Sequence, residues 1–363
     1  MMFPPKEVIG IDIGNYAVKV VCFAEEKKVI KLKDWGYIPL AIKADTPPEE
    51  KKAIISQEIK TYLKKKGIQA RYAAASISGN AVIVRYVKLP KLSKKELALT
   101  INVEAEPFIP FDIKDVNLTY YILNETSDSG EPKMDTVLVA AKREAVQDKI
   151  DIITGAGLDP LIIDVDSFAL ETLYEKLAPK GETASSVLLL NIGQKVTNLS
   201  IVSQGVTRVV RDIFIAGSTF DKTVSKMLKG DAAAADAVKK NKSVLVSDED
   251  KAAAIEAFDR DGIAVSKAAS GVLKDLCTEV SRSIDFYLSQ GVEHSISRII
   301  VSGGIANLGN ITKFLAAEFK VPAEVMNPLA FLTEPPKNMP KDVLPALAVA
   351  AGLALRKLKD WEE

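Results

Sequence analysis

Two turns, far apart in the chain, each place a glycine and polar side chains directly after an apolar strand. The first is the run Asp12-Ile13-Gly14-Asn15-Tyr16. A glycine at a strand end lets the backbone approach a ligand, and the turn after it presents several N–H groups on one side, which suits phosphate. Asp12 could hold the water molecules of a metal ion bound to such phosphates. On its own, the pattern is more typical of an ordinary hairpin with an Asp-Gly turn.

The second turn repeats the first in the other half of the chain. VIGIDIGNYAVKVVCF and VLLLNIGQKVTNLSIV share the order apolar strand, acid or amide, glycine, polar turn and strand. Gly193 stands in the place of Gly14, and the polar residues around it are Asn191, Gln194, Lys195, Thr197 and Asn198. Two such hairpins facing each other across a cleft would hold a phosphate chain from both sides. The alternative, that similar turns simply recur in a strand-rich protein, stays open.

A third motif is the run RIIVSGGIANLGNI, in which an apolar strand leads into Ser302-Gly303-Gly304 and a helix starts near Asn310. Paired glycines leave room for a flat group, such as adenine or ribose, against the backbone. The alternative is a glycine-rich loop between a strand and a helix, which is common in α/β proteins.

A fourth motif lies on a long helical segment between the second turn and the paired glycines. Spacings of three, four and seven place four side chains on one helix face: Glu279, Arg282, Ser283 and Phe286. Such a face is most often a solvated stripe of ion pairs. It becomes a candidate for ligand binding because it lies between two candidate ligand loops in the sequence. Lys19, further along the first hairpin, is assigned no contact.

The elements that must position these residues predict an α/β protein. The chain has 363 residues, and one hydrophobic core stops growing near roughly 250–300 residues, so two lobes are expected. Three strands are expected in each half, at 8–13, 18–23 and 29–35 and at 187–192, 197–202 and 206–215. The stretch 178–186 contains proline and glycine and is the expected lobe boundary. A capping box formed by Ser93 and Glu96 predicts a helix that runs to Pro107, and a polar loop is expected at 124–135.

The composition excludes several classes of protein. Lys plus Arg number 48 and Asp plus Glu number 48, so the chain has no basic excess for nucleic acid. Cys22 and Cys277 lie in apolar segments without ligand spacing, which predicts buried thiols. The single histidine, His294, excludes a His-rich metal site. No apolar run approaches the about 20 residues of a bilayer span, so any contact with a membrane is expected to go through a partner.

Together, the four motifs resemble the actin-like ATPase superfamily, in the order first phosphate loop, second phosphate loop and adenosine loop. Within it, the chain is similar to the PilM family of type IV pilus assembly. The run VEAEPFIPFDIKDVNLTYYIL carries that likeness, through Glu104, Pro107, Ile109, Pro110 and Phe111. Members of the family have this pattern in an inserted subdomain that FtsA also possesses. The resemblance spans the whole chain.

The resemblance implies an actin-like fold of two lobes with an FtsA-type inserted subdomain. The first lobe would be 1–180, with a core of 1–75 and 160–180 and the insertion at 76–159. The second lobe would be 187–344, with a small subdomain at about 230–262. The helix 345–363 would return to the first lobe.

The resemblance also assigns site residues for ATP and Mg²⁺. In the first phosphate loop these are Asp12, Gly14, Asn15 and Tyr16, with Asp12 reaching the metal through water. In the second they are Asn191, Gly193, Gln194, Thr197 and Asn198. Gly217 would be the glycine of the turn into the helix that follows the second sheet edge. The adenosine side would be formed by the helix residues Glu279, Arg282 and Ser283 and by the loop residues Gly303, Gly304 and Asn307. Asp166 falls where relatives keep a residue that positions water or metal.

One departure affects the expected activity. Hydrolysing relatives begin the second phosphate loop with Asp, and this chain has Asn191 there. An amide cannot act as a base, so we expect at most a slow ATPase. The implied role is an ATP-binding cytoplasmic scaffold, peripheral to the inner membrane, that binds the cytoplasmic tail of PilN in a groove of the first lobe. Other pilus platform and motor proteins are implied partners, and homo-oligomerisation stays open.

Two other functions stay open within the same superfamily. A small-molecule kinase would need a catalytic Asp beside a substrate pocket, and Asp166 is the candidate. An FtsA-like filament protein would carry a C-terminal amphipathic membrane helix, whereas the end LALRKLKDWEE is a weak match to one.

Overall fold

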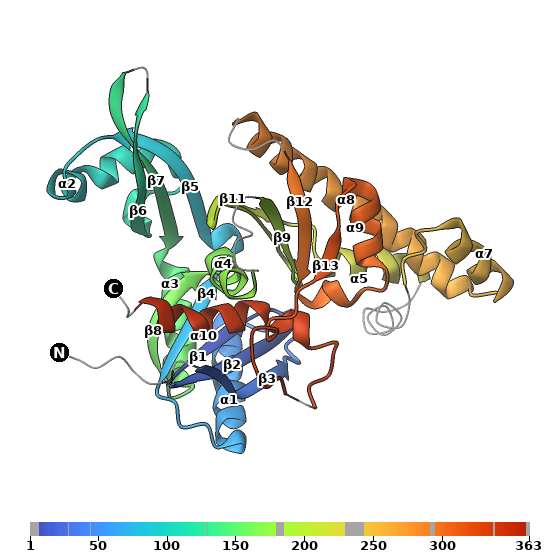
Figure 1. Cartoon of the computed structure of the whole chain (residues 1–363). Helices are drawn as coiled ribbons and strands as arrows, with labels where there is room; N and C mark the ends of the chain where they lie inside the picture. Colours follow the sequence, from blue (N-terminus) through green and yellow to red (C-terminus); the bar gives the residue numbers. More distant parts are fainter. Residues whose placement is uncertain are drawn as a thin grey trace.

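The structure is a computed structural model of the chain, and it describes residues 7–27, 29–43, 45–128, 130–178, 185–228, 243–290, 295–336 and 338–360. The chain folds into two lobes, each built on a five-stranded sheet, and a three-stranded sheet projects from the first lobe (Figure 1). Most of the expected boundary at 178–186, the tract 230–242 of the expected small subdomain, and His294 lie outside the described residues.

The first sheet has an antiparallel half and a parallel half. Its order is β3-β2-β1-β4-β8, with the bounds Val29–Pro39, Ala17–Glu26, Glu7–Ile13, Tyr72–Ile77 and Asp159–Val165. β1, β2 and β3 are joined by short turns and pair antiparallel, whereas β4 and β8 pair parallel. Parallel neighbours need long crossover connections, which here contain the helices of this lobe and the inserted subdomain.

The second sheet repeats this order strand for strand. Its order is β11-β10-β9-β12-β13, with the bounds Val206–Ile213, Thr197–Ser203, Ser186–Ile192, Ile296–Ser302 and Ala323–Val325. β9, β10 and β11 pair antiparallel, and β12 and β13 pair parallel. The two similar hairpins are therefore β1–β2 and β9–β10, in equivalent places of the two sheets.

Two helices lie between the sheets: α4 (Asp166–Leu177) and α10 (Ala348–Asp360) (Figure 1). They share one apolar core with the facing sides of both sheets. The packing is close enough to need glycine, because a Cβ on Gly10 of β1 would lie 2.0 Å from a carbonyl oxygen of α10. A Cβ on Gly352 would lie 1.9 Å from a carbonyl oxygen of α4. The Ala-rich end of the chain is thus a core helix, with small side chains that permit this approach.

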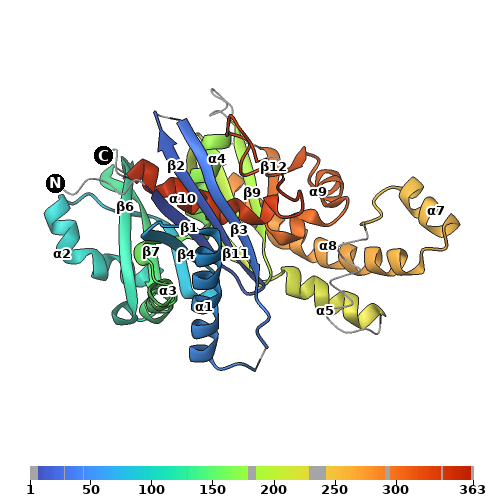
Figure 2. The ribbon, with the colours of Figure 1, turned by 90° about the horizontal axis from the view of Figure 1, so that it is seen from below.

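The outer faces of the sheets carry the remaining large helices. α1 (Pro48–Lys66) and α3 (Arg143–Gly155) pack against the first sheet and stand beneath it in Figure 2. α5 (Gly217–Leu228), α8 (Arg260–Ser289) and α9 (Ile311–Phe319) pack against the second sheet. Each lobe is therefore layered as helices, sheet and shared central helices.

The inserted subdomain is a small sheet with the order β5-β7-β6, covered by α2. Its elements are β5 (Val82–Pro90), α2 (Lys94–Ala105), β6 (Val116–Asp128) and β7 (Glu131–Lys142). The predicted capping box of α2 is confirmed, since Ser93 and Glu96 exchange backbone and side-chain hydrogen bonds. Figures 1 and 2 place this subdomain on the opposite side of the molecule from α7 (Asp248–Glu256).

One sequence-based prediction of an element was wrong. The polar stretch 124–135 is not a loop, because β6 and β7 continue as paired strands to Asp128 and Glu131. Met134 of this stretch is buried in the core of the subdomain, whereas most of the other described residues are partly or fully exposed, so polar residues suit them. The long helix α8 begins at Arg260, where the Asp259 carboxylate accepts a hydrogen bond from the Gly262 N–H and caps the helix.

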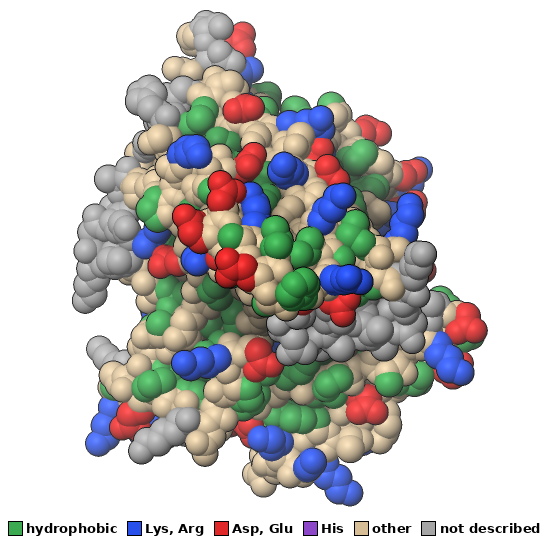
Figure 3. All heavy atoms as spheres, turned by 90° about the vertical axis from the view of Figure 1, so that its right-hand side faces the viewer, with side chains coloured by type: hydrophobic (Ala, Val, Ile, Leu, Met, Phe, Trp, Pro, Cys, Tyr) green, Lys and Arg blue, Asp and Glu red, His purple; other side chains and the backbone are tan. Residues whose placement is uncertain are grey.

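The surface mixes charges of both signs. On the face that forms the right-hand side of Figure 1, Lys and Arg are interspersed with Asp and Glu (Figure 3). Across the ranges that the structure describes, none of the helices is both long and apolar enough to span a bilayer. The apolar side chains of α10 from Ala348 to Leu355 are buried between the lobes.

Candidate functional site

The two hairpin turns line one cavity of about 960 Å³, which is formed by residues of both lobes. In each turn the glycine N–H donates to a carbonyl three residues on, from Gly14 to Ala17 at 3.2 Å and from Gly193 to Val196 at 3.0 Å. Most of the predicted site residues line the same cavity: Asp12, Gly14, Asn15, Tyr16, Asp166, Asn191, Gly193, Gln194, Asn198, Gly303 and Gly304.

The first turn holds an ion pair that the sequence reasoning missed. Lys19 Nζ lies 2.9 Å from Asp12 Oδ2, and both side chains are largely buried. The two residues face each other across the antiparallel hairpin, and residues directly opposite on one face come into contact. A Cβ on Gly14 would lie 2.7 Å from Lys19 Nζ, so glycine makes room for the cation beside the turn. The cross-strand register was the signal that could have revealed this contact.

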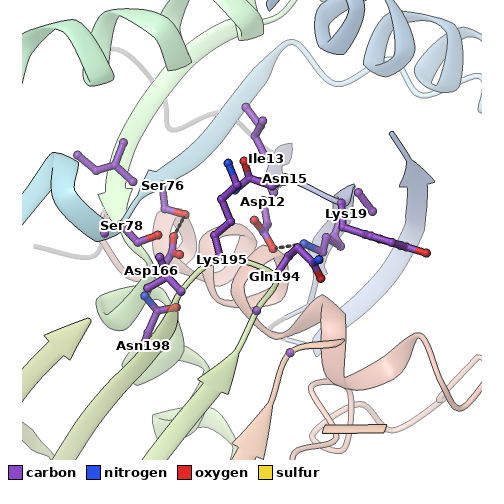
Figure 4. A pocket seen from close by; sticks show the side chains of 18 of the residues that line it. Asp12, Ile13, Asn15, Lys19, Ser76, Ser78, Asp166, Gln194, Lys195 and Asn198 are labelled. Atoms are coloured by element: carbon purple, nitrogen blue, oxygen red, sulfur yellow. Dashed lines mark hydrogen bonds and ion pairs between the residues drawn. The ribbon is translucent and has the colours of Figure 1, made fainter. Parts of the chain in front are cut away.

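Asp166 stands at the first position of α4, and its carboxylate accepts a hydrogen bond from Ser76 Oγ at 2.5 Å. Figure 4 shows Asp166 with Ser76 and Ser78 in one group and Asp12 with Lys19 in another. Burial and the negative charge of Asp12 raise the pKa of Asp166 to about 6, against the hydrogen bonds of both serines. The site therefore contains two carboxylates in different surroundings: Asp12 is ion-paired with Lys19, whereas Asp166 accepts a hydrogen bond from Ser76.

A second lysine, also missed from the sequence, stands behind the first turn. Lys149 of α3 donates from Nζ to the Ile13 carbonyl oxygen at 3.1 Å. Burial lowers the pKa of Lys149, while the charges of Asp166 and Asp12 oppose that effect. Together with Lys19, it places two lysines beside the two carboxylates on this wall of the cavity.

At the second turn, the facing residues of the hairpin are amides instead of an ion pair. Asn191 Nδ2 donates to Asn198 Oδ1 at 2.8 Å, and Gln194 Nε2 donates to Asp221 Oδ2 at 2.8 Å. Lys195 and Lys222 also line this side of the cavity.

Two of the predicted residues support the second turn from behind. Thr197 is fully buried and donates to the Ile215 carbonyl at 2.7 Å, away from the cavity. The Gly217 N–H donates to the Gly193 carbonyl at 2.9 Å, and a Cβ on Gly217 would lie 2.6 Å from Gln194 Oε1. Both residues thus fix the shape of the turn and stand outside the cavity lining.

The paired glycines differ from each other. Gly303 has φ +86°, and a Cβ there would lie 2.4 Å from the Ile192 carbonyl oxygen, so this position requires glycine. Gly304 faces open space, which leaves room for a ligand against the backbone. Asn307 is exposed and donates to the Asp342 carbonyl at 2.5 Å, so its amide is directed to the proline-rich loop.

The helix face predicted on the adenosine side does not reach this cavity. Glu279 is ion-paired with Arg211 of β11 and with Arg282, both at 2.5 Å, and Arg211 also donates to Ser283 Oγ at 3.1 Å. These contacts join α8 to the second sheet. The structure therefore places Glu279, Arg282 and Ser283 in an ion-pair cluster, as the alternative interpretation of the stripe expected.

The chemistry of the cavity fits a polyphosphate with a divalent cation. Backbone N–H groups of two turns and the ammonium groups of Lys19 and Lys149 can balance phosphate charge. Asp12 and Asp166 offer carboxylate oxygens of the kind that Mg²⁺ and its water ligands prefer.

Comparison with solved structures gives one close match and several distant ones. A chain of a "PilM-PilN type IV pilus biogenesis complex" has 28% sequence identity and a TM-score of 0.80, covering 98% of this chain and 100% of that one. MreB5 of Spiroplasma citri bound to ADP has 14% identity and a TM-score of 0.53, covering 98% and 97%. EutJ from Carboxydothermus hydrogenoformans has 12% identity and a TM-score of 0.53, covering 97% and 90%.

These likenesses establish the fold as that of actin-like ATPases, with two lobes and an inserted subdomain. The sequence model of the family described as type IV pilus assembly protein PilM matches residues 10–259 and 266–358. The match includes both hairpin turns, the inserted subdomain and the paired glycines. The chain therefore belongs to the PilM family of type IV pilus assembly proteins.

Proposed function

We propose that this chain binds ATP with Mg²⁺ in the cavity between its lobes and serves as a scaffold of the type IV pilus inner-membrane platform. The observation that carries the proposal is the pair of equivalent hairpin turns that line one cavity. One protein with this fold is known in complex with nucleotides: MreB5 of Spiroplasma citri bound to ADP and to AMPPNP.

The residues of the two turns would divide the work of binding. The N–H groups around Gly14 and Gly193 and the ammonium of Lys19 would contact phosphate oxygens. Asp12 would hold Mg²⁺ through water, and Asp166 would position a further water or the metal. Gly304 would leave room for the nucleoside. Bound Mg²⁺ supplies charge neutralisation between phosphate oxygens.

Hydrolysis should be slow because the second turn lacks an acid. The Asn191 amide neither accepts a proton nor coordinates Mg²⁺ as a carboxylate does. Its side chain is 9% exposed and is hydrogen-bonded to Asn198 and Ser302, so it is held in place. ATP would then act as a bound signal for lobe closure, with turnover as a minor process.

The partner we propose is the cytoplasmic tail of a PilN-type membrane protein, bound in a groove of the first lobe. Membership of the PilM family and the likeness to the chain of a PilM-PilN complex support it. Attachment to the inner membrane would then go through this protein partner, and other platform components would assemble on the same scaffold.

Calorimetry with the full chain tests both ligands. Mg-ATP should bind the unmodified chain, and Lys19→Met should weaken that binding by about tenfold or more, because it removes a charge-assisted contact. Lys267→Met, which removes an exposed lysine from α8, is the matched control and should leave the affinity unchanged. A synthetic PilN tail peptide is titrated in the presence and absence of Mg-ATP. Absence of binding by either ligand would overturn the proposal.

A further inference from the structure

A chain of side-chain hydrogen bonds crosses the second sheet at the edge of the cavity. Ser302 Oγ donates to Asn191 Oδ1 at 3.2 Å, and Asn191 Nδ2 donates to Asn198 Oδ1 at 2.8 Å. Asn198 Nδ2 then donates to Asp212 Oδ1 at 2.8 Å. These residues stand on β12, β9, β10 and β11, which are consecutive neighbours in the sheet. The chain therefore passes from strand to strand without skipping one.

The hydrogen-bond chain ends in the opposite lobe. Asp212 Oδ2 accepts a hydrogen bond from the backbone N–H of Gly79. Gly79 begins the short 3₁₀ turn Gly79–Ala81, which leads directly into β5 of the inserted subdomain. Just before it, Ser76 holds Asp166 in the cavity. One short segment of the first lobe thus touches the cavity, the second lobe and the inserted subdomain.

The chemistry of Asp212 fixes the direction of the whole chain. An ionised carboxylate only accepts hydrogen bonds, so Asn198 must present its NH₂ group to Asp212 and its carbonyl oxygen to Asn191. Asn191 must then present its NH₂ group to Asn198, and its own oxygen accepts from Ser302. Asn191, Asn198 and Ser302 are 9%, 2% and 2% exposed. Reversing one buried amide would leave groups unsatisfied at a cost of about 1–3 kcal/mol each.

This direction also explains why an amide suits position 191. Asn198 offers a donor on one side and an acceptor on the other, and Asp212 takes the donor. A carboxylate at position 191 would compete for the same donor, because its oxygens would face the Asn198 oxygen. Each NH₂ group has a second hydrogen that the chain does not use. Since Asn191 lines the cavity, it offers a donor suited to a phosphate oxygen.

We infer that Asp212 is a positioning residue that links the nucleotide cavity to the base of the inserted subdomain. Its carboxylate orients the Asn191 and Asn198 amides towards the cavity and holds the Gly79 N–H of the opposite lobe. The inference rests on the proposed function, because a nucleotide is the ligand whose phosphate would bind the Asn191 amide and close the lobes. Closure would tighten the contact between Asp212 and Gly79, and loss of the nucleotide would relax it.

Amide exchange at Gly79 tests this link in the full chain labelled with ¹⁵N-glycine. Exchange is measured with and without Mg-AMPPNP for the unmodified chain and Asp212→Asn. Asn198 and Gly79 donate to different oxygens of Asp212, and in asparagine an NH₂ group replaces one of these oxygens, so one of the two donors would face another donor. Gly79 should exchange about tenfold faster or more in Asp212→Asn, as expected for a lost hydrogen bond to a charge. The slowing caused by Mg-AMPPNP should disappear as well.

The matched control is Asp275→Asn, which removes an exposed carboxylate from α8 in the same lobe. It should retain the exchange rate and the response to Mg-AMPPNP of the unmodified chain. Helical circular dichroism of each variant shows whether it is folded. An unchanged Gly79 rate in folded Asp212→Asn would overturn the assignment.

A second variant distinguishes a relay from a local contact. Asn191→Asp changes β9, two strands away from Asp212, and should draw the donor of Asn198 away from Asp212. Gly79 should then exchange several fold faster. If the contact between Asp212 and Gly79 is purely local, the exchange rate should stay the same, and that result would overturn the relay. These two measurements need no nucleotide. Failure of Mg-AMPPNP to bind the unmodified chain in calorimetry would instead reject the proposed function.

Discussion

Replacing Asp166 by asparagine should stabilise the ligand-free chain at neutral pH. The carboxylate stands at the first position of α4, where burial and the charge of Asp12 raise its pKa to about 6. Hydrogen bonds from Ser76 and Ser78 and the charge of Lys149 reduce this effect without cancelling it. The folded chain therefore keeps an ionised group in a place that disfavours its charge.

The sign follows from proton binding. The ordinary pKa of the group is 3.8, so between about pH 4 and 6 the folded state binds more protons than the unfolded state. The free energy of unfolding therefore falls as pH rises through this window, and the full cost is present above it. A shift of about two pKa units corresponds to about 3 kcal/mol. Asp166 also supports the charge of Lys149, so the expected net gain of Asp166→Asn above about pH 7 is about 1–3 kcal/mol.

Urea unfolding at about pH 4, 6 and 7.5 measures this gain as a shift of the transition midpoint. The difference between Asp166→Asn and the unmodified chain should be near zero at the lowest pH and grow through the window. Asp275→Asn, an exposed carboxylate on α8, should show no such growth. A constant difference across all three pH values, or a loss of stability that increases with pH, would refute the reasoning.

Four further substitutions test the packing and capping described above by urea unfolding. Gly352→Ala should destabilise the chain by about 3 kcal/mol or more, because its Cβ would meet a carbonyl oxygen of α4 at 1.9 Å. Gly271→Ala, on the exposed side of α8 with nothing within 4 Å, should instead stabilise it by up to about 1 kcal/mol; equal effects of the two would contradict the packing argument. Ser93→Ala should cost about 1 kcal/mol through loss of the capping box of α2, and Ser93→Asp, which keeps a cap, should cost less.

The hairpin turns could be predicted from the sequence because their signals are local. In each, an apolar strand, a glycine and a polar turn follow one another within a few residues, and both turns line the cavity. The duplication of the lobes was visible for the same reason, since each copy retains the pattern around Gly14 and Gly193. Fold class followed from this repetition together with the EPFIPF run.

The surroundings of the turns could not be predicted in the same way. Lys149 reaches the first turn from α3, and Ser76 reaches Asp166 from the end of β4. Such contacts depend on how distant elements pack, and no spacing in the sequence encodes them. The contacts of the helix stripe around Glu279 could not be predicted for a related reason. Arg211, which pairs with Glu279, stands on β11, and this ion-pair cluster lies outside the cavity lining.

The two hairpins differ in the chemistry of one polar pair of facing residues, and we propose that this difference gives them different roles. In each hairpin, the residue two positions before the glycine faces the residue five positions after the glycine: Asp12 faces Lys19, and Asn191 faces Asn198. The first pair is an ion pair at 2.9 Å, in which each charge is balanced by the other. The second is an amide pair at 2.8 Å, and every amide has both a donor and an acceptor to share. Only the amide pair can therefore continue a chain of hydrogen bonds that all run in one direction, from Ser302 beside the paired glycines to Asp212, which contacts the opposite lobe. In the proposed function, the duplicated fold would supply two turns for phosphate, and the two Asn residues in place of Asp and Lys would make the second turn a connector between the lobes.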